Sequence, residues 1–252
     1  MDMLYLAENQ HFWHIARRKY IYEKVSSMLT KLYGDNFKNV HILDVGAGTG
    51  SVTRHFLNQG FCNIAIGEIH PQGLEYAKTY GIEKLYCMDL LDVPFSNEFD
   101  CIFAFDVIEH IEDDKAAIKN MQSMLKSNSK SLLCLSVPAH KWLWNAHDCL
   151  VHHKRRYTKA TLANVLHSCG LKIQVLQYFF VSITPLLYLR ALLNPAHKAS
   201  SLAKTKELRD VPPPKIINNA LLGICAVENY ICHTLRLSPP FGGSLFAIAS
   251  RA

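Results

Sequence analysis

The sequence predicts an α/β protein with a mostly parallel sheet that helices cover on both faces. Short apolar runs alternate with amphipathic stretches between residues 39 and 180, at intervals that suit strand–helix–strand crossovers. A glycine-rich turn, "GAGTG", directly follows the first of these runs. Hydrophobic residues make up 49% and charged residues 19% of the 252 residues, which is enough apolar material for a packed core.

Each element follows from a local pattern. One helix is expected over 7–33, because its apolar residues recur at helical spacing. Apolar runs predict strands at 39–50 (ending in the glycine turn), 63–69, 84–90, 99–111 (running into a helix near Asp113), 130–138, 171–180 and 242–252. Helices are predicted at 51–60, 71–81 and 158–170, because each of these segments ends in a glycine; Thr158 is the expected N-cap of the third.

The length predicts a single domain, 1–252, with four parts. We expect an N-terminal helical cap (1–36), a core (37–180), a helical insertion or lid (181–237) and a final strand (238–252). The insertion is inferred because its 57 residues are too many for a hairpin connection; a polar loop, 194–215, interrupts it.

The most apolar run, 178–193, is shorter than a membrane-spanning helix and contains Pro185 and Arg190. A transmembrane span is therefore not expected. The alternatives are a buried helix, a lid over an apolar acceptor, or a peripheral membrane contact through 178–193.

Composition excludes several classes of function. The formal charge of +6 is spread along the chain without a basic cluster, so nucleic acid is not an expected partner. The eight cysteines form no CxxC pair, so neither a zinc site nor a disulfide framework is expected. This pattern, with no basic and apolar leader at the start of the sequence, predicts a cytoplasmic protein.

The glycine turn has the pattern G-x-G-x-G, with Gly46, Gly48 and Gly50. Its third glycine comes one residue too early for a dinucleotide-binding G-x-G-x-x-G. No Gly-Lys-Ser or Gly-Lys-Thr follows, so this is not a P-loop. Asp44 lies two residues before the first glycine, where it would repel a pyrophosphate and attract a cation or an amino group.

Acidic residues stand at the ends of the next strands. Glu68 ends the second strand and can accept both hydroxyls of a ribose, and Asp89 ends the third and can accept from an adenine amino group. The fourth strand delivers Asp106, Glu109 and His110 to the same edge. In open α/β sheets this carboxyl edge is where ligands bind.

These residues resemble the class I S-adenosylmethionine-dependent methyltransferases, in particular the bacterial type 11/12 methyltransferase-domain proteins. The resemblance extends over nearly the whole chain. It is carried by "HFWHIARRKYI", "ILDVGAGTG", "FDVIEH", "SVPAHKWLWNAHDCLVHHKRRYT" and "PPFGGSLFAIAS". It implies a Rossmann-like sheet of seven strands whose last strand is antiparallel. It also implies that the protein is an enzyme that converts S-adenosylmethionine to S-adenosylhomocysteine.

The resemblance assigns cofactor contacts by position. It places Asp44, Gly46, Ala47, Gly48 and Gly50 along the methionine part, Glu68 at the ribose, and Asp89 and Leu90 around the adenine, with Ile69 as a further cofactor residue. Asp106 is assigned to the same cofactor site. Arg17, near Trp13, is expected to meet the cofactor carboxylate; the alternative is an amphipathic helix with a basic outer face. Two residues depart from the family pattern: Glu68 replaces the commoner Asp, and Ala47 the commoner Cys or Gly.

The segment after the fifth strand, "WLWNAHDCLVHHKRRY", concentrates polar and aromatic residues beside the same edge. A hydroxyl or protonated amine acceptor needs a base, and histidine suits that task. We therefore predict catalytic roles for His147, Asp148 and His153, with Asp148 orienting an imidazole. Acceptor contacts are predicted for Trp142, Trp144, Arg155, Arg156 and Tyr157. The alternatives are lid packing for the tryptophans and a brace to Asp148 for one arginine.

His110 is a separate catalytic candidate. Some related O-methyltransferases of quinone biosynthesis with the same Glu-His pair are thought to use it near a divalent metal. Asp106, Glu109 and His110 could form such a site, but their spacing equally suits the start of a helix, and no metal is predicted.

The expected function is methyl transfer to a small-molecule or lipid- or glycan-linked acceptor, most readily at oxygen or nitrogen. Two other classes stay open: an NAD-dependent oxidoreductase on a related sheet, and a methyltransferase-like binding module without turnover.

Overall fold

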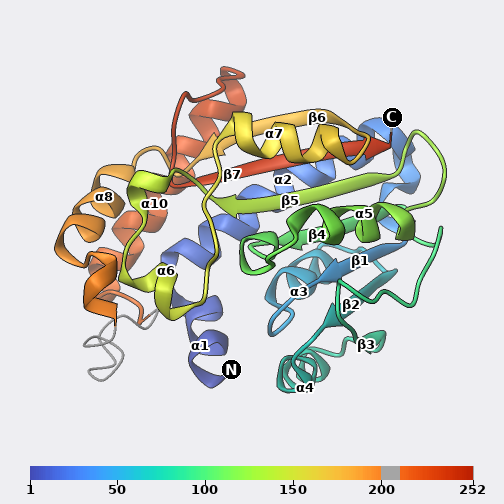
Figure 1. Cartoon of the computed structure of the whole chain (residues 1–252), viewed down its shortest axis with the longest axis horizontal. Coiled ribbons are helices and arrows are strands. Elements are labelled where there is room, and N and C mark those ends of the chain that lie inside the picture. The colour runs from blue at the N-terminus through green and yellow to red at the C-terminus, as the bar shows by residue number, and fades with distance from the viewer. Residues whose placement is uncertain (200–210, 252) are drawn as a thin grey trace.

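The computed structural model describes residues 1–199 and 211–251 and contains one seven-stranded sheet (Figure 1). The strand order is β3-β2-β1-β4-β5-β7-β6. The strands are β1 (Ile42–Val45), β2 (Ile64–Glu68), β3 (Leu85–Cys87), β4 (Cys101–Phe105), β5 (Leu132–Pro138), β6 (Leu171–Phe179) and β7 (Ser244–Arg251). Strands β1 to β5 pair in parallel, whereas β7 runs antiparallel between β5 and β6. The predicted sheet with an antiparallel last strand is confirmed.

The helices alternate with the strands as the sequence predicts. They are α1 (Asp2–Gln10), α2 (Phe12–Tyr33), α3 (Ser51–Asn58), α4 (Pro71–Thr79), α5 (Asp114–Met124), α6 (Ala146–Leu150), α7 (Lys159–Ser168), α8 (Thr184–Leu193) and α10 (Lys215–Thr234). The predicted cap of α7 is confirmed, because the Thr158 side chain accepts from the amide of Thr161. Short 3₁₀ turns occur at Gly34–Asn39, Ile108–His110, Lys141–Leu143 and Ala196–Lys198.

The N-terminal prediction of one helix over 7–33 is wrong. The helix begins five residues earlier, at Asp2, and is broken at His11, whose extended backbone (φ −77°, ψ 130°) separates α1 from α2. The His11 side chain accepts from the amide of Trp13 and so caps the second helix. The break lets α1 turn away from α2 and lie across the glycine turn.

The third strand also differs from the prediction. It is shorter than 84–90 and covers only Leu85–Cys87. The predicted polar loop 194–215 lies partly outside the described residues.

Two apolar clusters fill the two faces of the sheet. One joins strand residues such as Leu43 and Ile102 to Ile118 of α5 and Leu166 of α7. The other cluster joins the opposite strand faces to α2, α3 and α10, with Ile21, Val25, Phe56 and Cys225 among its members. Helices therefore cover both faces of the sheet, which fixes the strand ends that carry the site.

The strand register brings the predicted acids to one edge. Asp44 lies beside Ile66 of β2 and Phe103 of β4, so the carboxyl ends of the three strands meet. Glu68 ends β2 and Asp106 directly follows β4 at this edge. Among the described residues, no helix combines the length and apolar character needed to cross a bilayer.

Candidate active site

The turn after β1 is built for close approach of a ligand to the backbone. Gly46, Gly48 and Gly50 all have positive φ, at 61°, 59° and 82°, which favours glycine. A Cβ on Gly46 would lie 2.7 Å from a methyl carbon of Val107, and one on Gly50 would lie 2.9 Å from Ile66. A larger residue at Gly46 or Gly50 would therefore strain the backbone and require Val107 or Ile66 to shift.

Asp44 lies beneath this turn and is almost fully buried. Its Oδ2 accepts a hydrogen bond from Thr53 Oγ1 at 2.7 Å. Burial raises the pKa of Asp44 to about 7, although the bond from Thr53 and the charge of Arg17 oppose the rise. The carboxyl group is therefore poised to ionise when a cationic group arrives beside it.

Glu68 joins the ends of two loops. Its Oε2 accepts from the amide of Gly48 and its Oε1 from the amide of His70, each at 2.9 Å. Each carboxylate oxygen has a second lone pair, so Glu68 can still accept from a vicinal diol. The Glu68 side chain thus links the end of β2 to the glycine turn.

The adenine end of the predicted cofactor site lies beyond β3. The Asp89 side chain is exposed and its Oδ1 accepts from the amide of Leu91 at 2.9 Å. Leu90 is buried, whereas Ile69, after β2, is 52% exposed. Apolar side chains with an exposed acid nearby suit a planar base with an exocyclic amino group.

Glu8 of α1 is a site residue that the sequence analysis missed. The hydroxyl of Thr49 in the glycine turn donates to its carboxylate, and the Cβ position of Gly48 lies 3.3 Å from Leu4 and 3.5 Å from Glu8. Burial raises the pKa of Glu8 to about 7. Helix α1 therefore covers the turn. An acid in a helix carries no sequence signal for this contact, because the contact depends on the break at His11.

Arg17 pairs with a protein carboxylate in this structure. Its guanidinium contacts Asp106, it lies 4.8 Å from the ring of Trp13, and its Nε has no hydrogen-bond partner. Asp106 has a positive φ of 58° and accepts from Ser136 Oγ at 3.0 Å. Burial lowers the pKa of Arg17, while the nearby acids Glu8, Glu109 and Asp44 oppose the change. Arg17 thus stands between the glycine turn and the residues after β4.

Asp148 lies at the centre of the segment 142–157, which is predicted to contact the acceptor and is called the acceptor segment below. It accepts from His153 Nδ1 at 2.7 Å, from Arg156 Nε at 2.8 Å and Nη2 at 3.0 Å, and from the amide of Asn145 at 2.9 Å. Burial opposes ionisation of Asp148, but the hydrogen bonds from His153 and Arg156 outweigh it and lower its pKa to about 2. Asp148 is therefore an anion at neutral pH and orients the imidazole of His153.

Arg155 and Arg156, which were predicted to contact the acceptor, are both bonded to groups of the protein itself. Arg156 is held by Asp148 and also donates to the Ala139 carbonyl at 3.0 Å. Arg155 pairs with Asp114 at 3.0 Å and donates to the Glu112 carbonyl at 2.7 Å. Arg156 therefore makes the predicted brace to Asp148, and neither guanidinium is left as an open anion site.

The aromatic residues of the segment divide into buried and exposed ones. Tyr157 is 2% exposed and its hydroxyl donates to Asp114 at 2.7 Å, so its ring packs in the interior instead of walling an open space. Trp142 is 49% exposed and its ring lies 5.0 Å from that of His140. Trp144 is half-buried.

His147 is half-buried at the start of α6, where its amide donates to Asn145 Oδ1 at 2.9 Å. Its neighbour in the family pattern, Asp148, lies one residue further along the same short helix and faces His153. The structure therefore joins Asp148 and His153, whereas Arg155 pairs with Asp114.

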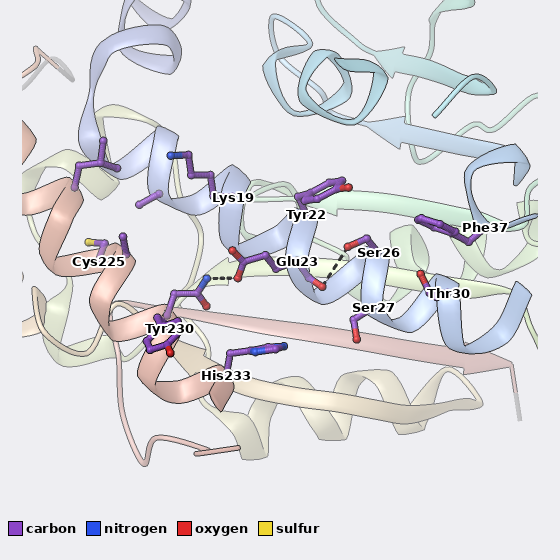
Figure 2. A pocket seen from close by; sticks show the side chains of 14 residues that line it. Lys19, Tyr22, Glu23, Ser26, Ser27, Thr30, Phe37, Cys225, Tyr230 and His233 are labelled. Carbon is purple, nitrogen blue, oxygen red and sulfur yellow. Dashed lines mark hydrogen bonds between the residues drawn. The ribbon is translucent and has the colours of Figure 1, made fainter. Parts of the chain in front are cut away.

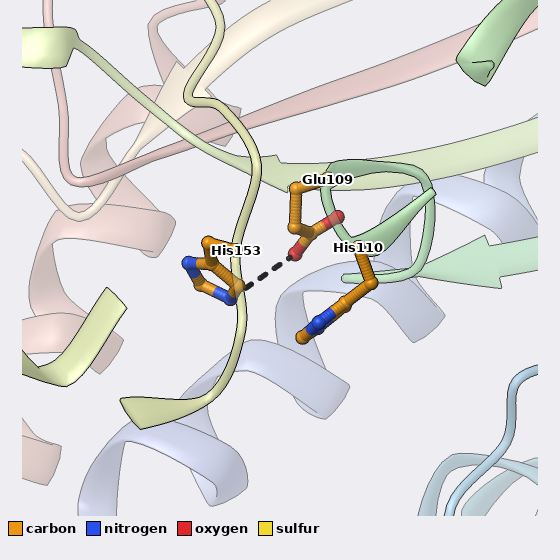
Figure 3. Close-up of side chains that lie close together, drawn as sticks. All are labelled: Glu109, His110 and His153. Carbon is orange, nitrogen blue, oxygen red and sulfur yellow. Dashed lines mark ion pairs between the residues drawn. The ribbon is translucent and has the colours of Figure 1, made fainter. Parts of the chain in front are cut away.

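Figure 3 shows Glu109, His110 and His153 converging from the loop after β4 and the acceptor segment. Glu109 Oε1 lies 3.9 Å from His153 Nε2, and the rings of His110 and His153 are 4.7 Å apart. The buried Glu109 carboxylate has no hydrogen-bond partner for either oxygen. Burial raises its pKa to about 8 and lowers that of His110 to about 4. Both groups are therefore mainly neutral at pH 7.

These three side chains each offer a ligand atom, all within 4.8 Å of one another. One carboxylate and two imidazoles could hold a divalent transition metal. This set differs from the alternative that the sequence suggested, because Asp106 is turned to Arg17 and His153 takes its place.

A groove of about 570 Å³ lies elsewhere, between α2 and α10 (Figure 2). Side chains such as Lys19, Glu23, Tyr230 and His233 line it. None of the site residues predicted from the sequence does so, and the groove is therefore separate from the glycine turn.

Comparisons with known proteins show similarity to methyltransferases. Residues 43–133 match the family described as "Methyltransferase domain". The chain is 29% identical over 127 residues to a ubiquinone biosynthesis O-methyltransferase of Rickettsia canadensis, covering 49% of this chain and 52% of that protein. The corresponding Rickettsia felis protein is 28% identical over 121 residues, covering 46% and 48%. The chain thus spans about half the length of the curated relatives it matches.

Solved structures share the fold. The plantazolicin methyltransferase BamL, in complex with a desmethyl-plantazolicin analogue and S-adenosylhomocysteine, superimposes with a TM-score of 0.61 at 13% identity, over 99% of this chain and 90% of that one. A putative sarcosine dimethylglycine methyltransferase from Galdieria sulphuraria gives a TM-score of 0.58 at 14% identity, over 95% and 86%.

Proposed function

We propose that this chain, a class I S-adenosylmethionine-dependent methyltransferase, transfers the methyl group to a hydroxyl or amine of a small-molecule or lipid- or glycan-linked acceptor, with His153 as the base. The observation that carries this proposal is the 2.7 Å bond from His153 Nδ1 to the buried anion Asp148. It orients an imidazole at the sheet edge where the glycine turn and the strand-end acids also lie.

S-Adenosylmethionine supplies an activated methyl group on a sulfonium when it is bound. The residues for it are those of the glycine turn. Asp44 would face the cationic part, Glu68 the ribose hydroxyls, and Asp89 with Leu90 the adenine. Glu8 would close the turn from α1. Arg17 is already engaged by Asp106, and a cofactor carboxylate would have to share it.

Methyl transfer is an in-line displacement, in which alignment and exclusion of water matter most. A lone pair on the acceptor oxygen or nitrogen forms the new bond to the methyl carbon. The carbon–sulfur bond breaks and its electron pair stays on sulfur, giving S-adenosylhomocysteine. The proton of the acceptor group must then leave, and a base lowers the barrier to that step.

The pair of Asp148 and His153 fixes which ring nitrogen acts. An ionised carboxylate can only accept, so the proton of the neutral imidazole lies on Nδ1. The lone pair is then on Nε2, which faces Glu109 and His110 at the sheet edge. Nε2 of His153 is therefore the atom that we assign to take the acceptor proton.

Oxygen is the acceptor atom that the comparisons favour. The matched curated relatives are named ubiquinone biosynthesis O-methyltransferases. The chemistry of the His153 site suits either oxygen or nitrogen.

A divalent cation bound to Glu109, His110 and His153 would compete with the base for the same Nε2 lone pair. Turnover that survives EDTA and is not raised by Zn²⁺ or Mg²⁺ supports the base. Turnover that EDTA abolishes and one of these ions restores favours the metal and removes the role assigned to His153.

The test begins with calorimetric titration of the protein with S-adenosylhomocysteine and with NAD. Binding of S-adenosylhomocysteine alone is expected; a response to NAD alone would revive the oxidoreductase alternative. A screen of hydroxylated and amine acceptors, read by conversion of S-adenosylmethionine to S-adenosylhomocysteine, then separates an enzyme from a binding module. Cofactor binding without conversion of any acceptor would favour the module.

A further inference from the structure

Large exposed apolar side chains are concentrated in residues 184–237. Fourteen of the 21 such side chains in the described parts of the chain lie there. We define an apolar face by three side chains of α8 and three of α10, which are 46% to 70% exposed: Leu189, Leu192, Leu193, Ile224, Val227 and Tyr230. A concentration of exposed apolar side chains of this kind indicates an interaction site in a folded protein.

Helix α10 has its polarity reversed relative to an ordinary surface helix. Its polar groups face the protein: Asn218 accepts from the amide of Phe12 at 2.9 Å, and Glu228 accepts from the amides of Val181 at 2.9 Å and Ser182 at 2.7 Å. Glu228 is the only acidic residue of α10, and the helix carries no Lys or Arg after its first residue. Its exposed side therefore carries large apolar residues, with Asn219, His233 and Thr234 as exposed polar residues and no Asp, Glu, Lys or Arg after Lys215.

Helices α8 and α10 belong to one structural unit. Leu187 of α8 and Leu222 of α10 pack against the same core cluster. The Glu228 bonds tie α10 to the residues just before α8. Both helices lie at the same end of the long axis of the molecule (Figure 1). The apolar face is therefore held in place by the fold, and its exposure is not explained by a loosely attached helix.

Cations without matching acids surround this face. Arg190, Lys215 and Arg236 lie on or beside the two helices, and the acid Glu228 is turned inward. The described residues between 184 and 237 contain four Lys or Arg and one acid, Glu228, which gives a net charge of 4 − 1 = +3. A second copy docked on this face would bring a second set of the same cations and no additional acids to the interface, which disfavours self-association.

Tyrosine and tryptophan add a second feature of membrane-surface proteins. Tyr188 is 46% and Tyr230 70% exposed, and Trp142 packs edge-on against Tyr188 with ring centres 5.7 Å apart. Aromatic side chains with a polar tip favour the headgroup level of a bilayer. Apolar, aromatic and cationic groups together match a lipid surface with negative headgroups.

We propose that α8 and α10 dock this protein on the surface of an anionic bilayer, with the apolar face turned to the lipid. Docking needs neither cofactor nor acceptor, so it goes beyond the proposed function. It also sets the orientation of the site, because α8 packs on the acceptor segment through the Trp142–Tyr188 contact and the 2.8 Å bond from the Ala146 amide to the Asn194 carbonyl. The acceptor segment would then lie close to the membrane.

The test is co-sedimentation of the full chain with vesicles of phosphatidylcholine alone and of phosphatidylcholine mixed with phosphatidylglycerol. We expect binding to the mixed vesicles, weaker binding to phosphatidylcholine, and a decrease at high salt. The variant Val227→Glu should lower the partition coefficient for mixed vesicles about tenfold or more. Leu91→Glu, at a site 50% exposed and outside the apolar face, should bind like the parent.

Three results would overturn the proposal. The parent protein could fail to sediment with mixed vesicles. Val227→Glu could bind them as strongly as the parent does. Light scattering could show a dimer that Val227→Glu dissociates, which would assign the face to a second copy. Calorimetric titration of parent and variants with S-adenosylhomocysteine measures folding and cofactor binding independently of vesicle binding. Absence of S-adenosylhomocysteine binding would count against the proposed function, whereas the docking proposal is judged on vesicle binding alone.

Discussion

His153 donates from Nδ1 to Oδ1 of Asp148 over 2.7 Å, and the same Asp148 carboxylate holds Arg156 with two further bonds. One buried anion therefore orients the imidazole of His153 and also fixes the position of residues 153–156 through Arg156. Catalytic and structural roles meet in this carboxylate, and the variants His153→Ala and Asp148→Asn should separate them.

Replacing the base tests the catalytic role alone. His153→Ala should lower kcat by about 10²- to 10⁴-fold, because proton removal loses its positioned base. The Kd for S-adenosylhomocysteine should stay nearly unchanged. His152→Ala is the matched control, because His152 is the adjacent, exposed histidine. Equal rates for the two variants, measured with the same acceptor, would dismiss His153 as the base.

Asp148→Asn should affect both activity and stability. The neutral amide cannot hold the Nδ1 proton of His153 as an anion does, and it leaves Arg156 without its counter-charge. We expect a loss of about 3 kcal/mol in the free energy of unfolding, since one partner of a buried pair is removed. Urea unfolding measures this loss. The anion stabilises the fold above pH 4 and ceases to do so as the pH falls toward about 2, so the difference between parent and variant should shrink across that interval.

The glycine turn offers a matched pair of substitutions. Gly46→Ala places a Cβ 2.7 Å from Val107 at φ 61°, whereas Gly81→Ala has a comparable φ of 76° and nothing within 4 Å. Both should lose about 1 kcal/mol of stability from the backbone alone. Only Gly46→Ala should also weaken S-adenosylhomocysteine binding, by tenfold or more in calorimetry. Equal cofactor affinity in the two variants would contradict the placement of the ligand on this turn.

The raised pKa of Asp44, about 7, gives cofactor binding a pH dependence. A cationic ligand favours the ionised carboxylate, so binding of S-adenosylmethionine should release a proton below pH 7, and its affinity should rise as the pH rises through about 7. Calorimetry in buffers of different ionisation enthalpy measures this release. Asp44→Asn should reduce it to the part contributed by Glu8, whose pKa is also raised to about 7. An unchanged proton release in Asp44→Asn would argue against a cationic contact at Asp44.

The strand ends could be predicted from the sequence because they depend on local patterns. An apolar run followed by "GAGTG" predicts that Asp44 and Gly46 lie at the sheet edge, and this prediction needs no information about distant parts of the chain. The approach of Glu8 to Thr49 could not be predicted, because it spans 41 residues and depends on a helix break that His11 alone marks. Helical periodicity continues across that break, so the pattern favours a single helix.

The acceptor segment illustrates a different limit. Its composition indicates a functional loop, and the bond between Asp148 and His153 agrees with the expected orienting role. Composition does not show which cations are engaged internally. Arg156 and Arg155 find their acids eight and 41 residues away, at Asp148 and Asp114, and such partners become visible only once the chain is folded.

The most direct measurement is a crystal structure of the complex with S-adenosylhomocysteine. It should show the ribose hydroxyls on Glu68, the adenine between Ile69 and Leu90, and the amino group near Asp44. The sulfur should face the space bordered by Nε2 of His153. A glycine turn that stays closed by Glu8 and Leu4 at saturating ligand, or a nucleoside bound elsewhere, would contradict the account.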